Sequence, residues 1–246
     1  MFAQELSEHT GVPLDAIFYT ATHAHAAPEI TNEIDMSYLT FEEDEEVDNL
    51  HKWGRLVYDQ MMDAADEALA NLEPVTMGIG YSNCYMNVNR NAKYTKADGT
   101  YYWAQGDNFE GFSDKTLAVM RFTSVETGNA DLAFEYGQTM IPSSEAGEYP
   151  VDLQVLRIGK VALVGFPGEM FNEIGAGVIS QSPVDDTLWV NLCWTRDNQQ
   201  TGYHSTDLIT VEGGQGSNKK YLPGYLEDAA AELTRKLVAE SLYFNQ

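Results

Sequence analysis

The sequence predicts a mixed α/β fold, an α+β arrangement in which mixed β-sheet layers are flanked by helices in a single domain. Segments with helical spacing alternate with β-rich segments, which favours this class over an all-β sandwich. The chain has 246 residues, 43% of them hydrophobic, which is enough to bury a substantial core. No internal repeat or inter-domain linker is recognisable, so the predicted domain spans residues 1–246.

Four helices are expected from apolar spacing and from the residues that end helices. The first spans residues 2–10 and ends at Gly11. The second, residues 50–72, has apolar residues at helical spacing and ends before Pro74. Two more are expected at 170–180 and 222–242.

Strands are expected where β-branched and aromatic residues cluster between turn residues. They are predicted at 16–22, 75–84 and 187–192, and in two hairpins, 116–122 with 131–136 and 153–158 with 161–166. Irregular structure is predicted for 23–48, for a polar loop following residue 84 and for 194–220, with an exposed stretch at 142–150.

The charge composition limits the classes of partner. The chain has 14 Lys and Arg against 38 Asp and Glu, a formal net charge of −24. Nucleic acids and anionic membranes need clustered basic residues, so we expect neither as a partner. No run of apolar residues is long enough for a transmembrane helix, and the first residues lack the basic and apolar segments of a signal peptide, so we expect none in this sequence. A cytoplasmic location is the default expectation, and an N-terminally shortened form of a secreted-type protein is the alternative.

Two histidines follow the predicted strand at 16–22. His23 and His25 are separated by one residue, which places both imidazoles on one face of an extended chain. Imidazole is a common zinc ligand, so the pair supplies two metal ligands, or one ligand and one substrate donor. The alternative is a pair of polar residues in a loop. Cys84 and Cys193 are too few for a thiolate zinc site, although the two could form one disulfide with each other.

Three further residues are candidates for chemistry. Glu169 follows an apolar strand and Pro-Gly, where it is either a metal ligand or general base, or a first-turn residue stabilising a helix. Tyr203 lies in a long polar loop, where its oxygen completes a zinc shell or stabilises an oxyanion, or its ring packs. Arg90 either clamps a substrate or pairs with an acidic neighbour.

Several short motifs occur in an order that resembles the neutral/alkaline ceramidase-like family. Residues 6–28 read LSEHTGVPLDAIFYTATHAHAAP, similar to the family segment that leads into Thr-His-Thr-His-x-Gly-Pro. Residues 78–80 and 87–90 read GIG and NVNR, residues 153–169 read LQVLRIGKVALVGFPGE, and residues 202–206 read GYHST. The resemblance spans about residues 2–240.

The resemblance implies a zinc-dependent amidohydrolase that cleaves an N-acyl amide bond. His23, Glu169 and Tyr203 would be the zinc ligands, His25 would bind the substrate or its oxyanion, and Arg90 would lie near the substrate. The implied partner is a small-molecule or lipid amide. The acidic charge points to a smaller or soluble amide.

This chain departs from the family pattern in three places. The family has a third histidine where residues 136–140 here read YGQTM, so only His25 or His204 could fill that ligand position. Residues 141–152 replace a long family segment that holds the nucleophilic serine of the ceramidases. The chain also starts partway into the family pattern. These departures favour an alternative function, a catalytically inactive homologue that acts as a binding or interaction domain.

Overall fold

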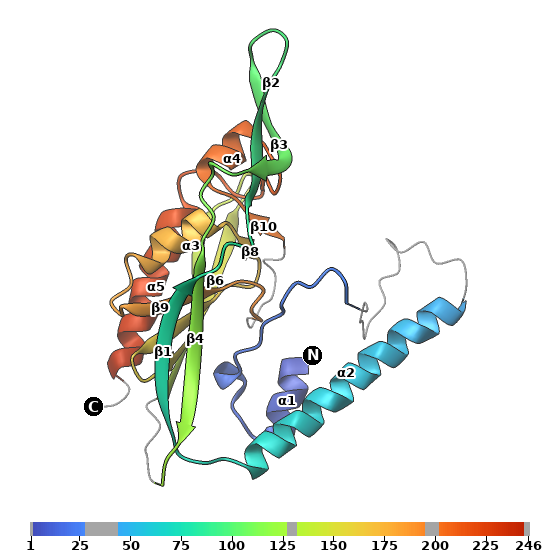
Figure 1. Ribbon diagram of the computed structural model, residues 1–246, viewed down its shortest axis with the longest axis vertical. Helices are drawn as coiled ribbons and strands as arrows, with labels where there is room; N and C mark the ends of the chain where they lie inside the picture. Colours follow the sequence, from blue (N-terminus) through green and yellow to red (C-terminus); the bar gives the residue numbers. More distant parts are fainter. Residues whose placement is uncertain (1, 28–43, 127–131, 195–201, 244–246) are drawn as a thin grey trace. The chain divides into compact units, whose positions relative to one another are not determined.

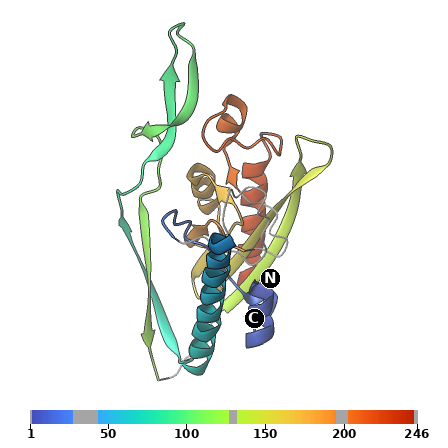
Figure 2. The ribbon, with the colours of Figure 1, turned by 90° about the vertical axis from the view of Figure 1, so that its right-hand side faces the viewer.

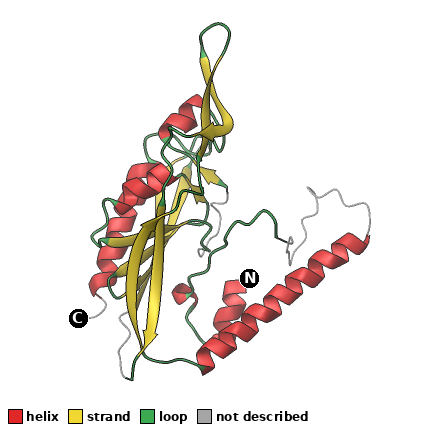
Figure 3. Ribbon diagram, viewed as in Figure 1, coloured by secondary structure: helices red, strands yellow, loops and turns green. Residues whose placement is uncertain are grey.

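The computed structural model describes residues 2–27, 44–126, 132–194 and 202–243, with the side chains of 44–51 excepted. The chain forms two compact units. The N-terminal unit comprises Met1–Ile17 and Thr22–Glu73, and the C-terminal unit comprises Phe18–Ala21 and Pro74–Gln246 (Figure 1). Helices and strands both contribute to the fold, which confirms the mixed α/β class (Figure 3).

The N-terminal unit is helical. It contains α1 (Phe2–Thr10), a short 3-10 helix (Leu14–Ala16) and α2 (Asp44–Ala70). The rings of Phe2 and Tyr58 meet edge to face at 5.9 Å, and His9 Nε2 lies 2.8 Å from Asp66 Oδ1, so α1 packs along α2.

Two predictions for this part of the chain are wrong. Residues 16–22 do not form a strand, because only Thr20 makes a bridge, to Cys193. Side-chain packing favours β-branched and aromatic residues as much as strand pairing does, so a β-rich composition alone does not establish a strand. The second helix begins at Asp44 rather than at residue 50, within an acidic run that suits a helix N-terminus. The predicted irregular segment lies largely outside the described residues.

The C-terminal unit is built on a four-stranded sheet with the strand order β5-β6-β7-β9. The strands are β5 (Leu132–Pro142), β6 (Glu148–Ile158), β7 (Val161–Gly165) and β9 (Asp186–Val190). β5, β6 and β7 are antiparallel, which confirms the predicted hairpin at 153–166, and β9 is parallel to β7.

One face of this sheet packs against α3 (Asn172–Ile179) and α5 (Leu226–Tyr243). Alternate residues of β6, Val151, Leu153 and Val155, are fully buried in this core. The buried Arg157 is on the same face, where its Nε and Nη2 donate to the carbonyl oxygen of Ser241, at 3.0 and 2.8 Å. That bond satisfies a carbonyl group near the C-terminus of α5.

Two strand pairs lie outside this sheet. β1 (Val75–Asn83) pairs with β4 (Thr116–Ser124), and β2 (Asn89–Thr95) with β3 (Tyr101–Asn108), both antiparallel. The β2–β3 hairpin extends beyond the rest of its unit in both views (Figures 1 and 2). It falls in the predicted polar loop, so that prediction is wrong. Its turn has Gly99 at φ 85°, and its aromatic residues favour strands.

The first predicted hairpin has the correct strands and the wrong partners. β4 pairs with β1, and β5 pairs with β6. Most of its predicted turn, at 126–129, lies outside the described residues. Sequence proximity favoured the local partner, whereas the β2–β3 insertion brings β1 and β4 together. No helix in the described part of the chain is both long and apolar enough to cross a membrane.

The segment that was predicted as a loop at 194–220 contains short elements. They are β10 (Tyr203–His204) and α4 (Asp207–Glu212), and β10 lies parallel to β8 (Glu169–Met170). α3 therefore begins at Asn172, and Glu169 belongs to a strand bridge rather than to the first turn of a helix. The predicted stretch at 142–150 forms the end of the β5–β6 hairpin.

Candidate functional site

The two histidines of the His-x-His motif lie side by side in an exposed turn. Their Nε2 atoms are 3.3 Å apart and their ring centroids 4.6 Å apart. His23 has φ 55°, so a left-handed backbone at His23 brings the two rings together, and not the extended strand that the sequence predicted. Two ligands of one tetrahedral zinc, each about 2.0–2.1 Å from the metal, lie roughly 3.3 Å from each other. The pair therefore fits two adjacent positions around one metal ion.

Glu169 and Tyr203 form a second cluster, on the paired strands β8 and β10. They are direct partners in the register, and the amide of Glu169 donates to the carbonyl oxygen of Gly202 at 2.8 Å. Burial raises the pKa of the Tyr203 hydroxyl, and the Glu169 carboxylate, which accepts its hydrogen bond, raises it further. A carboxylate, which is a common zinc ligand, and a protonated phenol thus lie together.

Arg90 lies close enough to act on this cluster. Its positive charge opposes the rise in the pKa of Tyr203. Its Nε is 3.9 Å from Asp107 Oδ1, and both side chains are more than half exposed. So weak and exposed an ion pair leaves the guanidinium able to meet a ligand. Three of the predicted site residues, Arg90, Glu169 and Tyr203, are therefore brought together.

The sequence left His204 open as a substitute metal ligand, but in the structure it is a buried residue of the core. It is fully buried, its Nε2 lies 2.8 Å from the Tyr149 hydroxyl, and its Nδ1 lies 3.1 Å from the carbonyl oxygen of Gly202. The carbonyl requires a donor, so Nδ1 carries the proton and Nε2 accepts from Tyr149. Both ring nitrogens are used, so His204 does not substitute for the absent third histidine.

Residues 136–140, which the resemblance places opposite the family's third histidine, contribute to a buried polar network. Tyr136 and Gln138 on β5 both donate to Asp152 Oδ1 on β6, at 2.9 and 2.8 Å. Asp152 is fully buried. Asp152 was not among the predicted site residues, although an aspartate within the apolar run VDLQVL is a signal for it.

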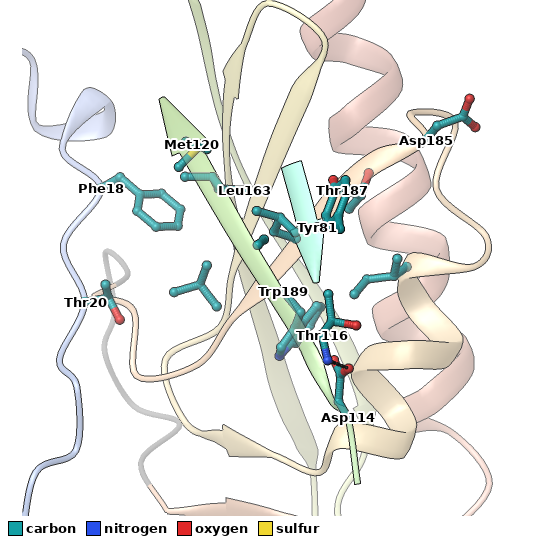
Figure 4. A pocket seen from close by; sticks show the side chains of 14 residues that line it. Phe18, Thr20, Tyr81, Asp114, Thr116, Met120, Leu163, Asp185, Thr187 and Trp189 are labelled. Atoms are coloured by element: carbon teal, nitrogen blue, oxygen red, sulfur yellow. Dashed lines mark hydrogen bonds between the residues drawn. The ribbon is translucent and has the colours of Figure 1, made fainter. Parts of the chain in front are cut away.

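A groove of about 610 Å³ opens elsewhere in the C-terminal unit. Its walls are mostly apolar and include Met120, Leu163 and Trp189, with threonine hydroxyls among them (Figure 4). Asp185 lies at one end with its carboxylate directed away from the other labelled residues. No lysine or arginine is among the described residues that line it, and no predicted site residue lines it either.

Asn191 connects this groove to the strand that bears Glu169. Its Oδ1 accepts a hydrogen bond from Trp189 Nε1 at 2.8 Å, and its Nδ2 donates to the carbonyl oxygen of Met170 at 2.9 Å. Met170 directly follows Glu169 in β8. A wall residue of the groove and the backbone of the strand that bears Glu169 are therefore joined through one side chain.

Both cysteines are free, so the disulfide does not form. Cys193 is buried, and burial raises the pKa of its thiol to about 12, which makes it a poor nucleophile or ligand.

The candidate metal ligands are divided between the two units. His23 and His25 belong to the N-terminal unit, and Glu169 and Tyr203 to the C-terminal unit. Within either unit, the described residues contain no group of three or more His, Cys, Asp or Glu side chains that could hold a metal. The joint ligand set stays a prediction. No family model matches the sequence, and comparison with curated proteins gives no match.

Proposed function

We propose that this protein is a metal-dependent hydrolase of ceramidase-like type that cleaves an amide bond of an N-acyl substrate. The observation that carries the proposal is the 3.3 Å separation of the Nε2 atoms of His23 and His25, a spacing that lets His23 hold a zinc ion while His25 meets a substrate oxygen beside that ion. The pairing of Glu169 with Tyr203 adds a second set of oxygen donors.

The residues take different roles in this proposal. His23, Glu169 and Tyr203 bind the zinc, and His25 donates a hydrogen bond to the substrate carbonyl oxygen. Zinc in such a site polarises a carbonyl and lowers the pKa of a bound water. Arg90 holds a polar group of the substrate through its guanidinium, whose Nε is 3.9 Å from the Asp107 carboxylate.

The groove suits the apolar part of such a substrate. Its volume of about 610 Å³ is within the usual range for small-molecule sites. Apolar walls bind a hydrocarbon or aromatic group, and the threonine hydroxyls can bond to a polar substituent on that part of the substrate. With a net charge of −24, the protein disfavours anionic substrates. We therefore propose a neutral N-acyl amide.

Hydrolysis of a fluorogenic N-acyl amide series tests this function. The expected result is turnover that a chelator abolishes and added zinc restores. Glu169→Gln and Tyr203→Phe keep the size of each side chain while weakening its metal binding, so both should reduce kcat/KM at least about tenfold. Val119→Thr, on exposed β4 surface, is the matched control and should retain full activity. No turnover across the series with zinc present would refute the proposal.

A second candidate function is a catalytically inactive homologue that binds a ligand. Two observations favour it: the third histidine position is filled by Gln138 and Tyr136, which bond to Asp152, and neither unit alone gathers three metal-binding side chains among its described residues. This candidate predicts that amides bind without being cleaved.

A further inference from the structure

We propose that Asn91 is a positioning residue for Tyr203, because its side-chain amide fixes the glycine-rich turn at residues 214–216 that packs against the tyrosine ring. The inference rests on the proposed function, in which Tyr203 binds the metal and acts in catalysis. It adds a residue that neither the motifs nor the charge pattern assigned.

The amide of Asn91 is bound at two points to the backbone of one residue. Its Oδ1 accepts from the amide of Gln215 at 2.9 Å, and its Nδ2 donates to the carbonyl oxygen of Gln215 at 3.3 Å. Together these bonds fix both the position and the orientation of Gln215, as a strand partner would. The two residues are 124 positions apart in the sequence.

Asn91 is itself held in place by its neighbours in the β2–β3 hairpin. The backbone amide of Asn91 donates to Asn89 Oδ1 at 2.9 Å, and its backbone carbonyl oxygen accepts from Asn108 Nδ2 at 2.9 Å. Its side chain is therefore presented to the turn from a rigid base.

The turn meets Tyr203 at a glycine. Gly216 has φ 75°, and a Cβ built there would lie 2.9 Å from Tyr203 Cγ and 3.0 Å from Phe171 Cε1. The backbone thus lies directly against the ring, and Phe171 meets the same ring edge to face at 6.3 Å. At the other side of the turn, the backbone of Gly214 lies equally close to the Asn91 side chain, because a Cβ there would be 2.8 Å from Asn91 Oδ1.

These contacts form a continuous chain from Asn91 through the turn to the ring that carries the Tyr203 hydroxyl. Tyr203 is 40% exposed, so its ring is not fixed by burial in the core. Release of the turn would remove the packing on one side of the ring and let the hydroxyl move away from Glu169.

The experiment places 3-fluorotyrosine at position 203 of the full chain, kept metal-free with a chelator, and records its ¹⁹F resonance. The chemical shift reports ring packing, and the change in shift between H₂O and D₂O reports solvent exposure. In Asn91→Ala, the resonance should move toward that of free 3-fluorotyrosine and the solvent effect should increase. Asn91→Asp keeps the acceptor and loses the donor, so it should give a smaller change in the same direction.

Asn87→Ala is the matched control, because Asn87 Nδ2 also donates to a backbone carbonyl, that of Asp114 at 2.6 Å. Its resonance should match the parent. Gly216→Ala provides a second variant and should displace the ring directly. An unchanged resonance in folded Asn91→Ala or Asn91→Asp, or an equal change in Asn87→Ala, would overturn the inference. Because the protein is metal-free, this result is independent of the hydrolysis assay that tests the proposed function.

Discussion

His23 and His25 face each other with their Nε2 atoms 3.3 Å apart, and the backbone of His23 is in the left-handed region at φ 55°. A residue with a Cβ is disfavoured in this region by roughly 1–2 kcal/mol. The strained residue is one of the two that bring the imidazoles together, which is the pattern expected where local strain supports a binding site.

The strain at His23 predicts an order of stability for its variants. Glycine adopts φ 55° without a steric penalty, so metal-free His23→Gly should be more stable than His23→Ala by about 1 kcal/mol. Denaturant unfolding in the presence of a chelator measures this difference. Equal stability of the two variants would show that His23 does not hold the left-handed conformation in solution.

The buried His204 predicts a loss of stability in acid. Burial lowers the pKa of its imidazole from 6.5 to about 4, so between these values the unfolded chain takes up a proton that the folded chain does not. The contribution is complete above pH 6.5 and disappears as the pH falls to about 4, a loss of about 3 kcal/mol. Denaturant unfolding at several pH values should show this slope in the parent.

Two variants separate the titration of His204 from its packing. His204→Gln should lower stability at pH 7 and flatten the slope between pH 6.5 and about 4. Tyr149→Phe removes the hydrogen bond to Nε2 and keeps the buried imidazole, so it should lower stability and retain the slope. If His204→Gln keeps the full slope, the acid sensitivity comes from other groups.

Close packing between β7 and the segment after β9 makes a third prediction. A Cβ at Gly165 would lie 2.5 Å from Cys193 Sγ, so Gly165→Ala should cost about 1–3 kcal/mol. Cys193→Ala removes the sulfur atom and should offset part of this loss in the double variant. Thermal unfolding of the two single variants and the double variant measures the coupling.

Gly177→Ala is the matched control for that substitution. A Cβ there meets nothing within 4 Å, and the residue lies within α3, so the variant should be as stable as the parent or more stable by up to about 1 kcal/mol. A tolerated Gly165→Ala, or strictly additive effects with Cys193→Ala, would contradict the packing described for this face.

The sequence predicted the elements that depend on local patterns. The helices that became α1, α3 and α5 and the β6–β7 hairpin were found, because apolar spacing and the Gly159 turn act within a few residues. Strand partners depend on contacts between distant residues, and so the pairing of β4 with β1 was missed. A polar, aromatic composition was also insufficient to reveal the β2–β3 hairpin.

The candidate site was predicted in part. Residue type and spacing pointed to the histidine pair and to Glu169, Tyr203 and Arg90, and the structure places each set together. Asn91 was missed as a support of Tyr203, because its side chain bonds to Gln215, which is 124 positions away in the sequence. The buried state of His204 was missed because neighbouring residues in a strand point to opposite sides, one toward solvent and one toward the core.

The most direct test of a metal-dependent site is the zinc content of the full chain, purified without chelator and then dialysed against a small excess of zinc. We expect close to one zinc per chain in the parent, and its loss in His23→Gly, a variant in which the strain is relieved and the ligand is absent. A parent protein that stays free of zinc, or a folded His23→Gly variant that retains it, would contradict the proposed zinc site.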